Sequence, residues 1–362
     1  MPLTHSEYLK IRHFPALDGL RAVAALMVVF FHYGGPDRLQ GWIGVQMFFV
    51  LSGFLITTLM LREEDRTGKV SLRRFYTRRA FRILPVYFLL LGLTAVIWVV
   101  MEKYQRSGLA DAMGYYLVFF NEFVGASPYG QSWSLGIEQK FYLVWPLLAF
   151  TIGAASVRRR LSIALGGMAL ALVLTPATLG ASGAGWPVHY FSILAGCVVA
   201  IAMHHPRGFA FVRPLTRPAV GICVAGAFLA VHLTLKPTGH FLGDVFALPG
   251  YVTEIPVYAV AVAVLLPVLI APGPVQRTLS MRWLVFLGER SYSLYLVQAI
   301  AALTATLALP KMSGISQAVT VTAIAVMMAC VLYRCVEVPM INLGRYLLAP
   351  ERKPQRAPVP VP

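Results

Sequence analysis

Arg21 and His32 lie eleven residues apart within the apolar stretch LDGLRAVAALMVVFFHY. At about 100° per residue, that spacing places both side chains on one face of a helix, about 16 Å apart along its axis. A charged arginine inside a membrane is costly unless it faces protein or water, and Asp18, one turn earlier, is its nearest partner in the sequence. The spacing therefore predicts a helix face that lines a cavity. The simpler alternative is that the two side chains reach the opposite headgroup regions.

A second group of polar residues occurs in the stretch QSWSLGIEQKFYLVWP. It contains Glu138, which lies at the outer end of a predicted span if the N-terminus is cytoplasmic. Glu138 is then expected at a depth similar to that of His32. A histidine oriented by a carboxylate is a standard general base for a hydroxyl proton. The alternative is a helix cap in which Ser132 or Ser134 begins the helix and Glu138 lies in its first turn.

The stretch GWIGVQMFFVLSGFLITTLM adds polar and small residues within one apolar run. Gln46 and Ser52 can supply hydrogen bonds inside a helix bundle. Gly41, Gly44 and Gly53 let helices approach closely, and packing alone is the alternative interpretation of this stretch.

The composition specifies the class of protein that must position these residues. Of 362 residues, 58% are hydrophobic and 13% are charged, which is too little polar surface for a soluble globular protein. Apolar runs long enough to cross a bilayer recur along the whole chain. We therefore expect an all-α integral membrane protein with about ten transmembrane helices in one bundle, near 16–33, 42–61, 84–101, 133–155, 161–178, 187–203, 218–235, 255–271, 283–308 and 316–336.

The charge distribution predicts the orientation of this bundle. With a cytoplasmic N-terminus, the inner loops carry 22 Lys and Arg residues and the outer loops carry 5, so both termini are expected to be cytoplasmic. The net charge of +16 follows from these clusters and does not indicate nucleic-acid binding. The four cysteines lie in or beside apolar segments without a CxxC pair, so we expect neither a disulfide framework nor a metal site. The N-terminal segment lacks a cleavage site and is expected to be retained.

Two connections are long enough to hold structure of their own. The inner connection, 68–87, interleaves basic and aromatic residues and predicts an amphipathic helix at the membrane interface. The outer connection, 102–132, can re-enter the membrane or cap an outward cavity. We expect residues 1–348 to form the transmembrane domain and the proline-rich tail, 349–362, to be disordered.

Six stretches resemble, in order and spacing, the acyltransferase family 3 membrane proteins. They are FPALDGLRAVAALMVVFFH, GVQMFFVLSGFLIT, FYTRRAFRILPVYF, SWSLGIEQKFYLVWP, LGERSYSLYLVQ and VEVPMINLGR. The resemblance covers nearly the whole chain. It implies about ten membrane helices and the transfer of acyl groups, often acetyl, from acyl-coenzyme A to hydroxyls of glycans, lipids or antibiotics.

The resemblance also implies roles for particular residues. His32 would be the general base, with Glu138 as its partner or as a second catalytic group. The donor-binding residues would be Arg21, Arg78, Arg79 and Arg82, since guanidinium groups match phosphate oxygens, and the alternative for the inner-loop arginines is binding of anionic lipids. The supporting residues would be Asp18, Gln46, Ser52, Ser132, Trp133 and Ser134. Gln298 departs from the family pattern, which often has histidine there. A mechanism with a second histidine is therefore disfavoured, and His32 is the stronger candidate for the general base.

The expected protein is thus a multi-pass O-acyltransferase of the bacterial inner membrane, with acyl-coenzyme A as co-substrate and no permanent cofactor. A cell-surface polysaccharide is the expected acceptor, and a lipid-linked glycan, a nodulation-type oligosaccharide and a macrolide-like molecule fit the same motifs. The sequence does not indicate an oligomeric state. The rival hypotheses are a secondary transporter, with Arg21, His32 and Glu138 as intramembrane substrate or proton groups, and a scaffold without chemistry.

Overall fold

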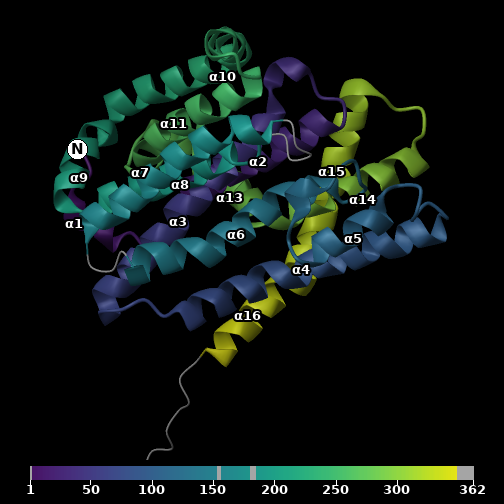
Figure 1. Cartoon of the computed structure of the whole chain (residues 1–362), viewed down its shortest axis with the longest axis horizontal. Helices are drawn as coiled ribbons and strands as arrows, with labels where there is room; N and C mark the ends of the chain where they lie inside the picture. Colours follow the sequence, from purple (N-terminus) through teal and green to yellow (C-terminus); the bar gives the residue numbers. More distant parts are fainter. Residues whose placement is uncertain (1, 153–155, 180–184, 349–362) are drawn as a thin grey trace, which may run out of the picture.

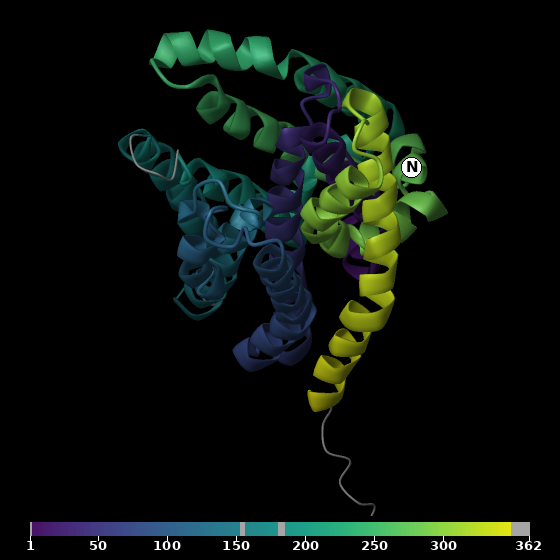
Figure 2. The same cartoon turned by 90° about the vertical axis from the view of Figure 1, so that its right-hand side faces the viewer.

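A computed structural model describes residues 2–152, 156–179 and 185–348 as helices joined by turns, with no strand in those ranges. Figure 1 shows α10 on one flank of the molecule and α4 with α16 on the opposite flank, and the view turned by 90° agrees (Figure 2). The tail predicted over 349–362 and part of the predicted span 133–155 lie outside the described residues.

The first half of the chain forms the elements that carry most of the predicted site. Its helices are α1 (His5–Lys10), α2 (Pro15–His32), α3 (Gly44–Thr67), α4 (Leu72–Val100), α5 (Leu109–Leu117) and α6 (Trp133–Leu147). Short 3-10 turns occur at Asp37–Leu39, Gly41–Ile43, Asn121–Phe123 and Gly130–Ser132, and a π-helical stretch, Leu148–Ile152, follows α6.

The second half packs around these helices. Its helices are α7 (Val157–Leu174), α8 (Val188–His204), α9 (Pro206–Val212), α10 (Pro218–Phe246), α11 (Gly250–Ile270), α12 (Pro274–Leu279), α13 (Arg282–Glu289), α14 (Ser291–Ala308), α15 (Gly314–Leu332) and α16 (Val338–Leu347). Turns of 3-10 helix lie at Pro176–Thr178 and Arg213–Thr216, and a π-helix, Tyr333–Glu337, joins α15 to α16.

The chain is a multi-pass membrane protein, although fewer helices qualify as spans than the sequence predicts. Among the described residues, seven helices are long and apolar enough to cross a membrane, or eight if α8 and the segment after it, bent by 109°, count as one span. α6 has only 15 residues, which is short for a bilayer core of about 30 Å. The count of ten and the cytoplasmic termini stay predictions.

Two predicted elements differ from the structure. The inner connection does not form a separate interfacial helix: its residues are the first turns of α4, which Ser71 caps and which continues through Pro85. The predicted span 283–308 is divided into α13 and α14 at Arg290. Gly288 of α13 allows a close approach to α2, because a Cβ there would lie 1.9 Å from the carbonyl oxygen of Asp18. α13 is thus packed directly against α2.

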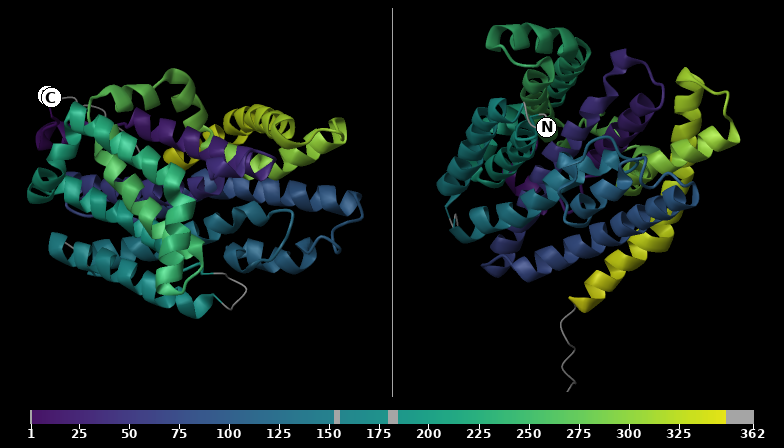
Figure 3. Two further views of the ribbon diagram at one scale, coloured as in Figure 1. Left: turned by 90° about the horizontal axis from the view of Figure 1, so that it is seen from above. Right: turned by 45° about the vertical axis from the view of Figure 1, so that its right-hand side comes forward.

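α3 runs through the interior of the bundle, as the view from above also shows (Figure 3). It packs against α2, α8 and α11. Its window of highest hydropathy is 83% buried, whereas that of α10 is 17% buried, so α3 is a core helix and α10 faces outward. Polar groups on α3 therefore point into protein rather than into lipid.

Candidate active site

Five helices bring polar side chains to a cavity of about 90 Å³. α2 contributes Arg21, α3 contributes Ser52, α4 contributes Arg79 and Arg82, and α6 contributes Glu138. The remaining lining residues are Val45, Phe48, Phe49, Ile83, Ser134, Leu135, Tyr142, Ser291, Tyr292 and Tyr295. The structure thus brings Arg21, two of the inner-loop arginines and Glu138 into one enclosed space.

Glu138 is the carboxylate at the centre of this cavity. Because Ser134, Glu138 and Tyr142 are four residues apart, α6 presents all three on the same face. The hydroxyls of Ser52 and Tyr142 hydrogen-bond to each other, and both act on the Glu138 carboxylate together with the charges of Arg79 and Arg21. The predicted contribution of Ser52 is thus confirmed as a hydrogen bond inside the bundle.

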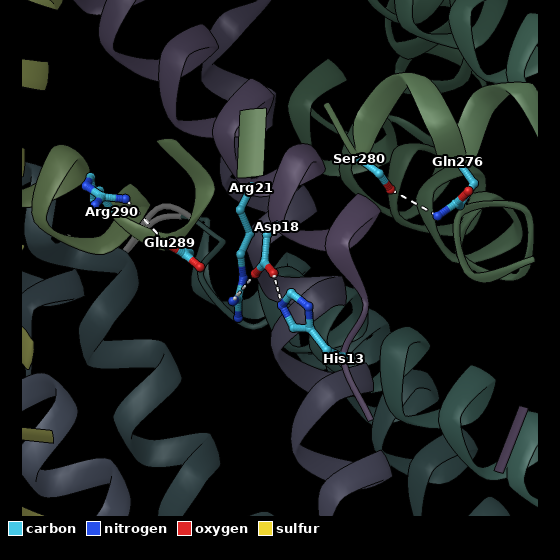
Figure 4. Close-up of polar contacts among 7 residues, drawn as sticks. All are labelled: His13, Asp18, Arg21, Gln276, Ser280, Glu289 and Arg290. Atoms are coloured by element: carbon cyan, nitrogen blue, oxygen red, sulfur yellow. Dashed lines mark hydrogen bonds and ion pairs between the residues drawn. The ribbon is translucent and has the colours of Figure 1, made fainter. Parts of the chain in front are cut away.

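The arginines of the cavity differ in how they are held. Arg21 binds Asp18 with its Nη1 3.3 Å from Oδ1, and the other carboxylate oxygen of Asp18 lies 2.7 Å from Nε2 of His13 (Figure 4). The Arg79 guanidinium lies 5.2 Å from the centroid of the Tyr142 ring. Arg82 forms no ion pair or hydrogen bond with any residue that the structure describes.

A second cavity of about 410 Å³ adjoins the first, since Arg79 and Arg82 line both. It also contains Arg66, Arg78 and Arg345, and Arg78 is paired with Glu63 at 3.1 Å. The arginines predicted from the inner connection therefore line two neighbouring cavities that share Arg79 and Arg82, and the smaller of the two contains Glu138. We call these two cavities the basic path.

His32 lies away from this path. It is not among the described residues that line either cavity, and along α2 it is about 16 Å beyond Arg21. Its Nδ1 donates a hydrogen bond to the carbonyl oxygen of Val28 at 2.7 Å, which leaves the Nε2 lone pair of the neutral ring available. The sequence placed Glu138 at the depth of His32, whereas in the structure Glu138 faces Arg21 and the backbone of Val28 orients His32.

The start of α6 also differs from the capping alternative. Ser132 occupies the N-cap position but its side chain caps nothing: its Oγ donates to the carbonyl oxygen of Tyr129 at 2.7 Å and accepts from Nδ2 of Asn121 at 2.8 Å. Glu138 is in the second turn of α6, where it cannot serve as the reciprocal residue of a capping box. The capping alternative is therefore wrong, whereas the catalytic role of Glu138 stays a prediction.

Gln46 and Trp133 enclose a histidine behind the cavity wall. Ser192 Oγ donates to Oε1 of Gln46 at 2.8 Å, so the Gln46 amide nitrogen donates to Nδ1 of His189 at 2.9 Å. The His189 ring lies 4.7 Å from Trp133 and 5.7 Å from Phe49, centroid to centroid. Gln46 is thus confirmed as a hydrogen-bonding residue within the bundle, and its partner is His189.

Several residues at the site were not singled out from the sequence. Tyr295 donates to the carbonyl oxygen of Gln131 and lies 3.0 Å from Ser134 Oγ, at the wall of the cavity. Gln298, which was singled out from the sequence, is buried on the same helix and donates to the backbone oxygen of Tyr295 at 2.8 Å. Glu337 is 1% exposed and ends a π-helix that packs against α4, the helix that carries Arg82. The sequence signals for Glu337 are a carboxylate inside an apolar segment and its place in the stretch VEVPMINLGR.

Comparison with known proteins gives one consistent family. A family model described as "Acyltransferase domain" matches residues 14–334. The chain is 30% identical over 309 residues to a putative peptidoglycan O-acetyltransferase of Bacillus subtilis, covering 79% of this chain and 48% of the relative. It is 29% identical over 310 residues to the O-acetyltransferase OatA of Staphylococcus aureus, covering 79% and 50%. The chain spans about half the length of these curated relatives, and no solved structure matches it.

Proposed function

The chain belongs to acyltransferase family 3, and on that premise we propose that it is a membrane O-acyltransferase of the bacterial inner membrane. It transfers an acyl group, acetyl in the first instance, from cytoplasmic acyl-coenzyme A to a hydroxyl of a cell-envelope glycan. The observation that carries this proposal is the basic path through two cavities to Glu138. The name of the Bacillus subtilis relative, a putative peptidoglycan O-acetyltransferase, supports the choice of a glycan.

The donor binds along the basic path. Coenzyme A carries phosphates at one end and its thioester at the end of a long pantetheine arm, so it needs cations at a wide entrance and a narrow passage beyond. The wider cavity supplies Arg66, Arg78 and Arg345, and the shared Arg79 and Arg82 mark the passage to the smaller one. Guanidinium groups suit phosphate oxygens because they donate in parallel pairs.

Transfer takes place between the small cavity and His32. The acceptor hydroxyl oxygen attacks the thioester carbonyl carbon, the carbon–sulfur bond breaks, and coenzyme A leaves as the thiolate. His32 Nε2 takes the hydroxyl proton, since the Val28 carbonyl holds the proton of the neutral ring on Nδ1. Extended pantetheine is long enough for the distance of about 16 Å between Arg21 and His32, so the acyl group needs no covalent relay on the protein.

Glu138 serves the donor rather than His32. Its carboxylate balances the charges of Arg21 and Arg79 inside the bundle and accepts a hydrogen bond from the Ser52 hydroxyl. Arg21 keeps Asp18 as a partner, but without Glu138 the cavity would hold no lining carboxylate to balance Arg79 when the donor is absent, which is unfavourable. Glu138 is the second catalytic group in this proposal: its negative charge keeps the two guanidinium groups in place for the transfer step.

The test is transfer of labelled acetyl from acetyl-coenzyme A to cell-envelope glycan by the purified protein in liposomes. His32→Ala should abolish transfer, and His240→Ala, a change at an exposed histidine of α10, should leave it at the wild-type rate. The same reaction can be followed in cells by proton NMR of the O-acetyl groups on glycans. The glycans come from a deletion strain complemented with the wild-type protein or with either variant. Wild-type transfer by His32→Ala would refute the mechanism, and solute accumulation without consumption of acetyl-coenzyme A would favour a transporter.

A further inference from the structure

Glu337 is a buried carboxylate on an irregular part of its helix. It ends the π-helix Tyr333–Glu337, which interrupts the otherwise continuous run from α15 to α16. Single turns of π-helix occur often at functional sites, because the extra residue changes which side chains face inward. Here the Glu337 side chain, 1% exposed, bonds to α14 through Ser293, and the π-helix packs against α4, the helix of Arg82.

Only one oxygen of Glu337 has a hydrogen-bond partner. Oε2 accepts a hydrogen bond from Ser293 Oγ at 2.9 Å, and Oε1 has none among the described residues. Ser293 is itself fully buried, next to Ser291 and Tyr292 of the cavity wall. A buried, half-satisfied carboxylate is costly, so a compensating positive charge must lie nearby.

Three arginines act on Glu337, and two of them are already engaged. Arg21 binds Asp18. Arg290 donates to the Phe286 carbonyl oxygen at 2.5 Å and lies over the ring of Phe286. Arg82, whose charge acts on Glu337 most strongly, has no direct partner in the described part of the chain.

This arrangement compensates the charge of Arg82 without using its hydrogen-bond donors. A direct ion pair would occupy two of the five N–H groups of the guanidinium. A carboxylate held behind the cavity wall by Ser293 attracts Arg82 and leaves these groups free for a ligand. The cavities on either side of Arg82 are where such a ligand would enter.

We propose that Glu337 is a positioning residue for the donor: it holds Arg82, from behind the cavity wall, in the place where its guanidinium binds a phosphate of coenzyme A. The inference rests on the proposed function, because it takes coenzyme A as the ligand of the basic path. It assigns a role to a residue that touches neither cavity.

Equilibrium binding of labelled coenzyme A to the purified protein tests this role. Glu337→Gln keeps the size of the side chain and an oxygen for Ser293 but removes the charge, and it should weaken binding about tenfold. Glu337→Asp should weaken it less. Glu254→Gln is the matched control, since Glu254 is a carboxylate of α11 that is 6% exposed and outside both cavities. If Glu337→Gln does not fold, Ser293→Ala, which removes the hydrogen bond that places Glu337, should weaken binding in the same direction.

A double-mutant cycle separates positioning of Arg82 from a general structural role. If Glu337 acts through Arg82, adding Glu337→Gln to Arg82→Lys should cause little further loss of coenzyme A binding. If the double variant loses affinity by the product of the two single losses, the inference is overturned. Unchanged coenzyme A binding by a folded Glu337→Gln would also overturn it. Failure of the wild-type protein to bind coenzyme A would instead refute the proposed function, and this inference with it.

Discussion

Gly53 of α3 and Gly196 of α8 each face the backbone of the other's helix. A Cβ on Gly53 would lie 1.8 Å from the carbonyl oxygen of Ile193, and a Cβ on Gly196 would lie 2.0 Å from that of Val50. The two helices can therefore cross at backbone contact only because both positions lack a side chain. Ser52, next to Gly53, lines the cavity, so the crossing also sets the position of one wall of the site.

Gly196→Ala should therefore destabilise the protein and reduce its activity. The backbone atoms it would meet belong to a core helix and cannot move as a flexible side chain would, so the cost is expected to be about 1–3 kcal/mol. Thermal unfolding in detergent and acetyl transfer measure the two effects. Gly92→Ala on α4, where nothing lies within 4 Å of the added Cβ, is the control and should change neither. An equally stable Gly196→Ala would contradict this account of the crossing.

Asn121 joins the outer connection to the bundle, and its loss should loosen that connection. Its Nδ2 donates to the hydroxyl of Tyr87 at 2.9 Å and to Ser132 Oγ at 2.8 Å, and the residue is 1% exposed. Asn121→Ala leaves these buried groups without a donor, at an expected cost of about 1–3 kcal/mol.

Hydrogen exchange is the measurement for Asn121→Ala. Amides between α5 and the start of α6 should exchange faster than in the wild-type protein, while those of α3 should be unaffected. Gln105→Ala, an exposed change in the same connection, should leave the pattern as it is. Uniformly faster exchange, α3 included, would mean that Asn121 supports the whole fold rather than this connection.

The same connection explains why part of the site could not be predicted from the sequence. The spacing of Arg21 and His32 on one helix predicted a face that lines a cavity, and Arg21 does line one. The partners of Glu138 were not predicted, because its position was argued only from the outer end of an expected span. In the structure Ser132 is fully buried before α6 begins, and Glu138 lines the same cavity as Arg21.

Long-range partners account for the rest of what the sequence did not predict. Glu337 depends on Ser293, 44 residues earlier, and on Arg82 of another helix. The carbonyl that orients His32 belongs to Val28, and a sequence pattern does not indicate such a backbone bond. Motif spacing could identify which residue types matter, but their pairing depends on how the helices cross.

Glu138→Gln should lower the rate of acyl transfer without weakening donor binding. The amide keeps a hydrogen-bonding group for Ser52 but removes the negative charge that balances Arg21 and Arg79. Transfer should fall by about 100-fold or more. Coenzyme A should bind at least as tightly, because the cavity becomes more positive. Initial rates and equilibrium binding measure the two, with Glu102→Gln, an exposed carboxylate, as the control. Loss of binding together with transfer would mean that Glu138 shapes the cavity rather than the reaction.

The separation of His32 from the basic path predicts that binding and transfer can be lost independently. His32→Asn keeps a group that can donate to the Val28 carbonyl but removes the basic nitrogen, so transfer should stop. Coenzyme A should still bind at wild-type affinity, since His32 lines neither cavity in the described part of the chain. Arg82→Ala should have the opposite effect: the affinity for coenzyme A falls by about tenfold or more, so transfer is slow when acetyl-coenzyme A is limiting. A saturating concentration of acetyl-coenzyme A should restore part of the rate. If His32→Asn weakened coenzyme A binding as much as Arg82→Ala does, donor and base would share one site, and a path along α2 between them would be wrong.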